Sequence, residues 1–119
     1  RFDIPLNDPA LFTDNPAGQA FIRADERKLT KVTGRFLYFS SRLDARLRRL
    51  ARGALSAETT LLLAGEDQIV RSGATSAWAE RVSGGRAAVR WFAGSAHTLE
   101  FSADVGDFEA ALRHWAKGA

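Results

Sequence analysis

Residues 59–70 read TTLLLAGEDQIV, an apolar run that leads directly into a polar turn containing Asp67. A short apolar run without alternation is typical of a strand covered on both faces in a parallel sheet. A second run, residues 87–92, leads in the same way into a turn that carries His97. Residues just beyond the ends of parallel strands meet in the crevice where ligands bind. We therefore expect Asp67 and His97 to be neighbours in the folded chain.

The second half of the chain predicts the order strand, helix, strand, helix. The crossover helix is expected over residues 74–82, and Gly84 and Gly85 end it. The closing helix is indicated by apolar residues at helical spacing. Its apolar positions are Phe108, Leu112 and Trp115, its start is near Asp104 or Asp107, and Gly118 follows its end. Residues 59–117 thus form a βαβα unit, as a parallel strand pair requires.

The first half of the chain predicts a different organisation. Its first 15 residues are rich in Pro, Asn and Asp, which favours an extended, turn-rich segment. Asn15 and Pro16 are suited to begin a helix over residues 16–29, and a longer helix is expected over residues 30–51. The stretch 53–58, made mainly of small and polar residues, is the best candidate for the boundary between the two halves of the chain. We therefore predict a helical segment over residues 1–55 and a βαβα part over residues 56–119.

Composition limits the function classes. The chain has 119 residues, 45% of them hydrophobic, which suits one small domain. It has no cysteine, which excludes a thiolate metal site and a cysteine nucleophile, and its two histidines lack metal-ligand spacing. No stretch approaches the roughly 20 apolar residues of a membrane-spanning helix. We expect a soluble protein with no metal or cofactor, and the cytoplasm is the favoured compartment.

The positive charge is concentrated in one segment. The net charge is +3 and the pI is about 9.9, and arginines are dense between Arg35 and Arg52. Apolar residues recur there at spacings of three and four, which indicates an amphipathic helix with the arginines on its solvated face. These apolar residues are Phe36, Phe39, Leu43, Leu47 and Leu50. The alternative is a basic module that binds an anionic partner; nucleic acid is not the expected ligand.

Two observations predict that further polypeptide is needed. The sequence contains no methionine and begins with Arg1, so translation is not expected to start there. A sheet of only two parallel strands leaves an exposed edge that other strands can cover. We therefore expect the chain to be the C-terminal part of something larger, or to require a partner that completes its sheet.

These motifs resemble those of the α/β-hydrolase fold, and within it the monoacylglycerol lipase and lysophospholipase-like serine hydrolases. Residues 61–70 are similar to the acid-bearing turn after the seventh strand of that fold, and residues 94–99 (GSAHTL) are similar to its histidine loop. The order acid then histidine also fits this fold. Arg71 departs from the acidic or amide residue that relatives often carry there. The resemblance implies that the chain is the C-terminal part of an α/β-hydrolase, with a helical cap before the last two strands and helices.

The resemblance also implies a function. Asp67 would orient His97, which would act as general base and acid for a serine hydroxyl, in a carboxylic ester hydrolase for a lipid-like substrate. The chain contains no Gly-x-Ser-x-Gly elbow. The serine would therefore lie on an N-terminal polypeptide outside this sequence, and the chain alone would be inactive. Alternatives are another acyl substrate and a non-catalytic protein of the same fold.

Other candidate residues have simpler interpretations. Glu66 is a less favoured acid, Ser95 lacks the setting of a nucleophile, and His114 is expected at the surface. Three aromatic residues are expected in the core, namely Trp78, Phe92 and Trp91. Four in the first half are equally consistent with cap packing and with an acyl-chain pocket, namely Phe12, Phe21, Phe36 and Phe39.

Overall fold

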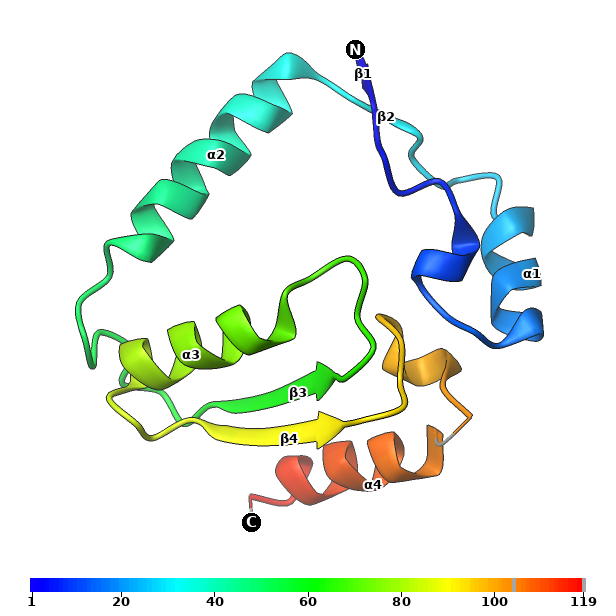
Figure 1. The fold of residues 1–119 in the computed structure, drawn as a ribbon. Helices are drawn as coiled ribbons and strands as arrows, with labels where there is room; N and C mark the ends of the chain where they lie inside the picture. The colour runs from blue at the N-terminus through cyan, green and yellow to red at the C-terminus, as the bar shows by residue number, and fades with distance from the viewer. Residues whose placement is uncertain (104, 119) are drawn as a thin grey trace.

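Two parallel strands, β3 (Thr60–Ala64) and β4 (Ala88–Phe92), form the centre of a mixed α/β structure (Figure 1). The computed structural model describes residues 1–103 and 105–118. Leu61 lies opposite Val89, and Leu63 opposite Trp91. Both strands fall within one residue of the predicted bounds, since each is a short apolar run between turn residues.

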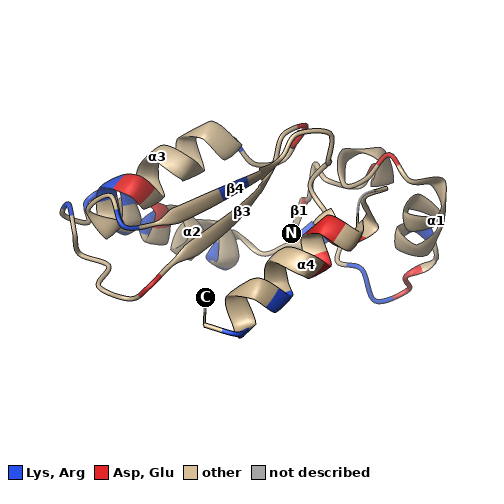
Figure 2. Cartoon of the chain, turned by 90° about the horizontal axis from the view of Figure 1, so that it is seen from below, with Lys and Arg blue, Asp and Glu red and all other residues tan. Residues whose placement is uncertain are grey.

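Helix α3 (Ser72–Ser83) connects the two strands, and α4 (Val105–Ala116) follows the second. The helices cover opposite faces of the strand pair (Figure 2). Gly84 ends α3 with φ of 69°, a left-handed conformation that glycine adopts without strain. Asp107 lies in the first turn of α4, whereas Asp104, the other predicted start, lies outside the described residues.

A small core joins the sheet to α4. Phe92 packs against Phe108 with their ring centroids 6.2 Å apart. The buried cluster consists of Ala64, Phe92, Leu99 and Ala111, with Leu62 and Phe108 packed against it. Of these, Leu62 and Ala64 are alternate residues of β3 and Phe92 ends β4, so they share the face toward α4, as a strand period of two requires.

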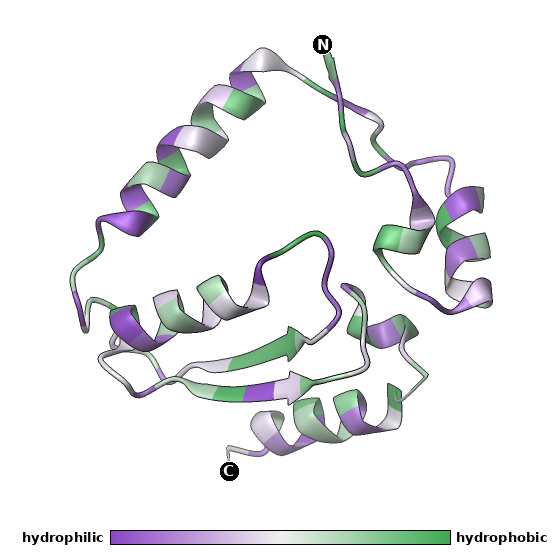
Figure 3. Ribbon diagram, viewed as in Figure 1, coloured by the Kyte–Doolittle hydropathy of each residue, from purple (hydrophilic) through white to green (hydrophobic). Residues whose placement is uncertain are grey.

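The opposite face of β4 is less well covered. Trp91, which the sequence placed in the core, is 48% exposed, whereas Trp78 is half-buried and Phe92 is buried. The prediction for Trp91 is wrong because α3 packs mainly over β3, where the paired residue Leu63 is buried, and leaves Trp91 open to solvent. No described strand pairs with the second edge of β3, the more hydrophobic strand (green in Figure 3).

The N-terminal segment begins with a short antiparallel pair, β1 (Phe2–Asp3) and β2 (Lys31–Val32). A single 3₁₀ turn, η1 (Pro9–Leu11), and helix α1 (Pro16–Ala24) lie between them. The Asn15 side chain accepts a hydrogen bond from the Ala17 amide at 3.0 Å, as predicted for a cap. Helix α1 ends before residue 29, because Asp25 is extended and its carboxylate accepts from the Arg27 amide.

Helix α2 (Gly34–Arg48) begins later than residue 30, because residues 31 and 32 belong to β2. Thr33 caps it by accepting from the Phe36 amide at 3.1 Å. No residue of α2 is buried. Its C-terminal end is held by α3, since Trp78 Nε1 donates to the Leu47 carbonyl at 3.1 Å.

The described chain is more open than a closed domain of its length. Its radius of gyration is 16.3 Å, against about 13.5 Å for a compact domain of 119 residues. Large apolar side chains of α2 are accordingly exposed, among them Phe36, Phe39 and Leu43. None of the helices built from the described residues combines the length and the apolar character needed to span a bilayer.

Candidate active site

The turn after β3 and the loop after β4 are joined by backbone hydrogen bonds. Gly65 donates to the Phe92 carbonyl at 2.9 Å, and Glu66 donates to the Ser95 carbonyl at 3.0 Å. A Cβ atom on Gly65 would lie 2.3 Å from the Ala93 carbonyl oxygen. Only glycine therefore permits this approach, which brings together the two segments that carry Asp67 and His97.

The Asp67 carboxylate is fixed by its own turn. Its Oδ1 atom accepts hydrogen bonds from the amides of Ile69 and Val70, both at 2.8 Å. This local pattern is typical of aspartate in turns. The side chain is only 7% exposed. Both the position of the carboxylate and its orientation are thus set by the backbone that follows β3.

Burial is the largest single influence on the pKa of Asp67, and it raises that pKa by disfavouring the charge. The hydrogen bonds from Val70, His97 and Ile69, together with the charge attraction of His97, act in the opposite direction. Their combined effect prevails and leaves the pKa of Asp67 below its usual value. The carboxylate is therefore ionised at neutral pH.

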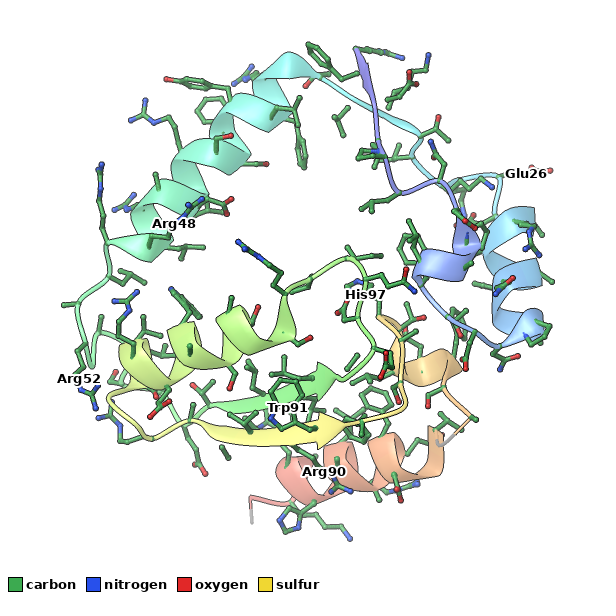
Figure 4. All side chains as sticks on the ribbon, in the orientation of Figure 1. Glu26, Arg48, Arg52, Arg90, Trp91 and His97 are labelled. Carbon is green, nitrogen blue, oxygen red and sulfur yellow. The ribbon has the colours of Figure 1, made fainter. Side chains whose placement is uncertain are left out.

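His97 meets the other oxygen of this carboxylate. Its Nδ1 atom lies 2.9 Å from Asp67 Oδ2. Since an ionised carboxylate only accepts, Nδ1 carries the proton and donates, which leaves Nε2 as the acceptor of the neutral ring. The imidazole is 31% exposed, and in Figure 4 it lies beyond the ends of β3 and β4, facing the N-terminal segment. No described residue forms a hydrogen bond with Nε2.

The loop that carries His97 is itself anchored. The Ser95 amide donates to the Phe92 carbonyl at 3.1 Å. The Ser95 hydroxyl lies 2.9 Å from the Ser102 hydroxyl, and Ser95 is 4% exposed. The Ser95 hydroxyl is therefore buried and directed at another hydroxyl of the same loop region.

The N-terminal segment reaches the same loop, a contact that the sequence did not reveal. The Phe12 carbonyl accepts from the Thr98 amide at 2.9 Å and from the Thr98 hydroxyl at 2.7 Å. The Phe12 ring also meets the His97 ring, with centroids 5.9 Å apart and planes inclined at 73°. The sequence singled out Phe12 only as one of four unassigned aromatic residues. No local signal identifies its partner so far along the chain.

The other candidate residues lie elsewhere. Glu66 is exposed, and its neighbour Asp67 makes the bond to the imidazole. His114 is exposed on α4, as expected. Phe21, Phe36 and Phe39 are all more than half exposed, and Phe21 lies against Phe101 with centroids 5.7 Å apart.

The arginines of α2 are exposed, but so are most of its apolar residues, because no residue of this helix is buried. Arg35 stacks over the Phe39 ring, and Arg42 stacks over Tyr38 while donating to its hydroxyl at 2.9 Å. Arg48 forms an exposed ion pair with Asp44 at 3.8 Å. These contacts occur within the helix and leave the positive charge open to solvent.

A cavity of about 680 Å³ opens between the strands and α4. Thr60, Ala88 and Trp115 are among the residues that line it. It therefore adjoins the beginnings of β3 and β4, whereas Asp67 and His97 follow their ends. Within residues 1–103 and 105–118, no group of three or more acidic or histidine side chains is placed to hold a metal ion.

Comparison of the chain with known protein families, curated protein sequences and solved structures gave no match. What the site offers chemically is a histidine whose Nδ1 is bonded to an anchored carboxylate. Such a carboxylate fixes the tautomer and stabilises the imidazolium that forms when Nε2 accepts a proton. The arrangement is suited to general base and general acid chemistry at Nε2.

Proposed function

We propose that this chain is the C-terminal part of an α/β-hydrolase and supplies the acid and the histidine of a Ser-His-Asp triad. The observation that carries the proposal is the 2.9 Å contact between His97 Nδ1 and Asp67 Oδ2. Both residues follow the ends of adjacent parallel strands, where active sites form in α/β sheets. The acid precedes the histidine along the chain, as in that fold.

Each residue has a defined role in the proposed reaction. His97 Nε2 takes the proton of a serine hydroxyl as that hydroxyl attacks the ester carbonyl. The imidazolium then returns the proton to the leaving alcohol, and water repeats the sequence on the acyl-enzyme. Asp67 remains ionised and holds the ring so that Nε2 faces the reacting atoms.

The serine and the oxyanion hole come from polypeptide outside this sequence, which has no Gly-x-Ser-x-Gly elbow. The unpaired edge of β3 is the side at which further strands would extend the sheet. We propose a carboxylic ester with a lipid-like acyl group as substrate. Its support is the apolar character of the exposed N-terminal residues, including Phe36, Phe39 and Leu43.

A fluorophosphonate probe tests this proposal on the complete protein that contains residues 1–119. The probe labels serines that a histidine activates, so we expect labelling of the intact protein and its loss in His97→Ala. His114→Gln is the matched control, because His114 is exposed and lines the cavity at the beginnings of β3 and β4, whereas Asp67 follows the end of β3. Ester hydrolysis should follow the same pattern.

Three results would contradict the proposal. Absence of labelling in the intact protein would indicate a non-catalytic protein of the same general architecture. Labelling that persists in His97→Ala would show that another base activates the serine. Labelling of Ser95, which Ser95→Ala would remove, would place the nucleophile within this sequence.

A further inference from the structure

We infer that Phe12 and Thr98 are positioning residues for His97, so that the N-terminal segment completes the active site by fixing the direction in which Nε2 points. This inference rests on the proposed hydrolase function. It concerns residues that do not touch the reacting atoms and act through the imidazole. Its structural basis is the pair of hydrogen bonds from Thr98 to the Phe12 carbonyl, together with the contact between the Phe12 and His97 rings.

A second contact is needed because the hydrogen bond to Asp67 does not stop the His97 ring from rotating about that bond. One hydrogen bond from Nδ1 fixes the distance and direction at that atom. The ring can still pivot about the bond, and Nε2 lies on the far side of the ring, where a small pivot moves it most. The Phe12 ring, inclined at 73° to the imidazole, blocks this pivot on one side. The bond to Asp67 and the aromatic contact together define the ring orientation.

Thr98 links this aromatic contact to the histidine loop. Its amide and its hydroxyl both donate to the Phe12 carbonyl, which uses both lone pairs of that oxygen. Because Thr98 follows His97 directly, the backbone beside the imidazole cannot shift without breaking both bonds. The same carbonyl belongs to the residue whose ring meets His97, so the two contacts move together.

The N-terminal clamp, defined as residues 8–15, is rigid enough to serve this purpose. The Phe12 amide donates to the Pro9 carbonyl at 3.1 Å, which closes the turn of η1. Thr13 is 1% exposed, and its hydroxyl donates to the Phe101 carbonyl at 3.3 Å. The Asn15 side chain donates to the same carbonyl at 3.1 Å. The clamp is thus fastened at Phe12 to Thr98 and, directly after Phe12, to the 3₁₀ turn η2 (Leu99–Phe101) that follows the histidine.

Kinetics of the complete enzyme test the inference with two variants. Thr98→Val removes the hydroxyl bond and keeps the amide bond, and Phe12→Ala removes the ring and keeps the carbonyl. A misplaced general base lowers the rate of the chemical step, so we expect kcat to fall about tenfold to a hundredfold with KM nearly unchanged. Thr98→Ser should restore kcat to within about twofold, because the hydroxyl returns.

Thr75→Val is the matched control, since the Thr75 hydroxyl also donates to a carbonyl, that of Arg71, but at the start of α3. It should keep the parental kcat. Parental kcat in folded Thr98→Val and Phe12→Ala would overturn the inference. A raised KM with unchanged kcat in Phe12→Ala would also overturn it, because Phe12 would then be a substrate contact.

A measurement independent of activity separates this inference from the proposed function. In proteins labelled with ¹⁵N-histidine, the Nδ1 proton of His97 should give a sharp NMR signal that Thr98→Val and Phe12→Ala broaden or shift. Unchanged signals in both variants would overturn the inference whatever the activity. If the signals change but His97→Ala still hydrolyses esters, the positioning contact stands and the hydrolase proposal fails.

Discussion

The amide of Glu66 donates to the carbonyl of Ser95 at 3.0 Å, which ties the turn after β3 to the loop after β4. The bond lies one residue before Asp67 and two residues before His97. The carboxylate and the imidazole therefore meet because their backbones already do. A substitution that disturbs the backbone of the two turns should therefore affect the site differently from one that changes only the carboxylate or the imidazole.

Gly65→Ala should disturb the site without altering any polar side chain. The added Cβ would lie 2.3 Å from the Ala93 carbonyl oxygen and 2.8 Å from its carbon, so the two turns must separate. We expect a loss of about 1 to 3 kcal/mol in the free energy of unfolding, as for other overpacked sites. Denaturant titration measures it.

Gly73→Ala is the control for this substitution. It lies in the first turn of α3, and a Cβ there has no heavy atom within 4 Å. Alanine should be neutral or stabilising by up to about 1 kcal/mol, since it favours the helix. Equal stability changes at the two positions would contradict the steric account of Gly65.

Asp67→Asn and Asp67→Ala should separate chemistry from structure. Asparagine keeps an oxygen for the Ile69 and Val70 amides but offers His97 an amide donor, which favours the wrong tautomer. By analogy with other triads, turnover in the complete enzyme should fall about 10⁴-fold, and stability at neutral pH should fall only by what the carboxylate charge contributes. Alanine should cost a further 1 to 3 kcal/mol, on the order expected when amides lose their acceptor. Equal stability of both variants would show that the turn does not depend on an oxygen acceptor at residue 67.

Acid should remove the stability that the Asp67 charge contributes. Because folding lowers the pKa of this carboxyl below its ordinary value of 3.8, the folded state binds its proton less readily than the unfolded state. The contribution is therefore complete above that value and declines as the pH falls through the folded pKa. Urea titrations should show the difference between the parent and Asp67→Asn shrinking below about pH 4. A difference that stays constant down to pH 2 would refute the linkage; Glu66→Gln, exposed and adjacent, is the control.

Trp78→Phe should loosen the end of α2. The substitution keeps an aromatic ring but removes the Nε1 donor to the Leu47 carbonyl. We expect a loss of about 0.5 to 1.5 kcal/mol and faster amide hydrogen exchange over residues 49–55. Trp115 is 60% exposed, so Trp115→Phe should change neither the stability nor the exchange rate. Unchanged exchange in Trp78→Phe would mean that Arg81, which donates to the Leu50 and Arg48 carbonyls, holds this end alone.

Sequence patterns predicted the elements whose signals are local. The apolar runs of β3 and β4, the glycine stop after α3 and the Asn15 cap all depend on neighbouring residues, and the structure has each of them. The short pair β1 and β2 has no such signal, because two-residue strands far apart in sequence show no periodicity. That pairing also explains why α2 begins at Gly34 instead of residue 30.

The candidate site was predictable in part for the same reason. Asp67 and His97 each follow a recognisable strand, and parallel pairing brings the strand ends together. The contribution of Phe12 was not predictable, because its partner Thr98 lies 86 positions away. Nor does local sequence reveal the exposure of Trp91, which depends on what packs over β4.

The two hydrogen bonds at the Phe101 carbonyl have a consequence for limited proteolysis. The connection between the halves of the chain is exposed at residues 56–58, where a protease has ready access. A cut there would sever the polypeptide but leave Thr13 and Asn15 bound to Phe101, and Trp78 bound to Leu47. The two fragments should therefore migrate as one species under native conditions and separate only in denaturant, with the surroundings of His97 preserved in the nicked molecule.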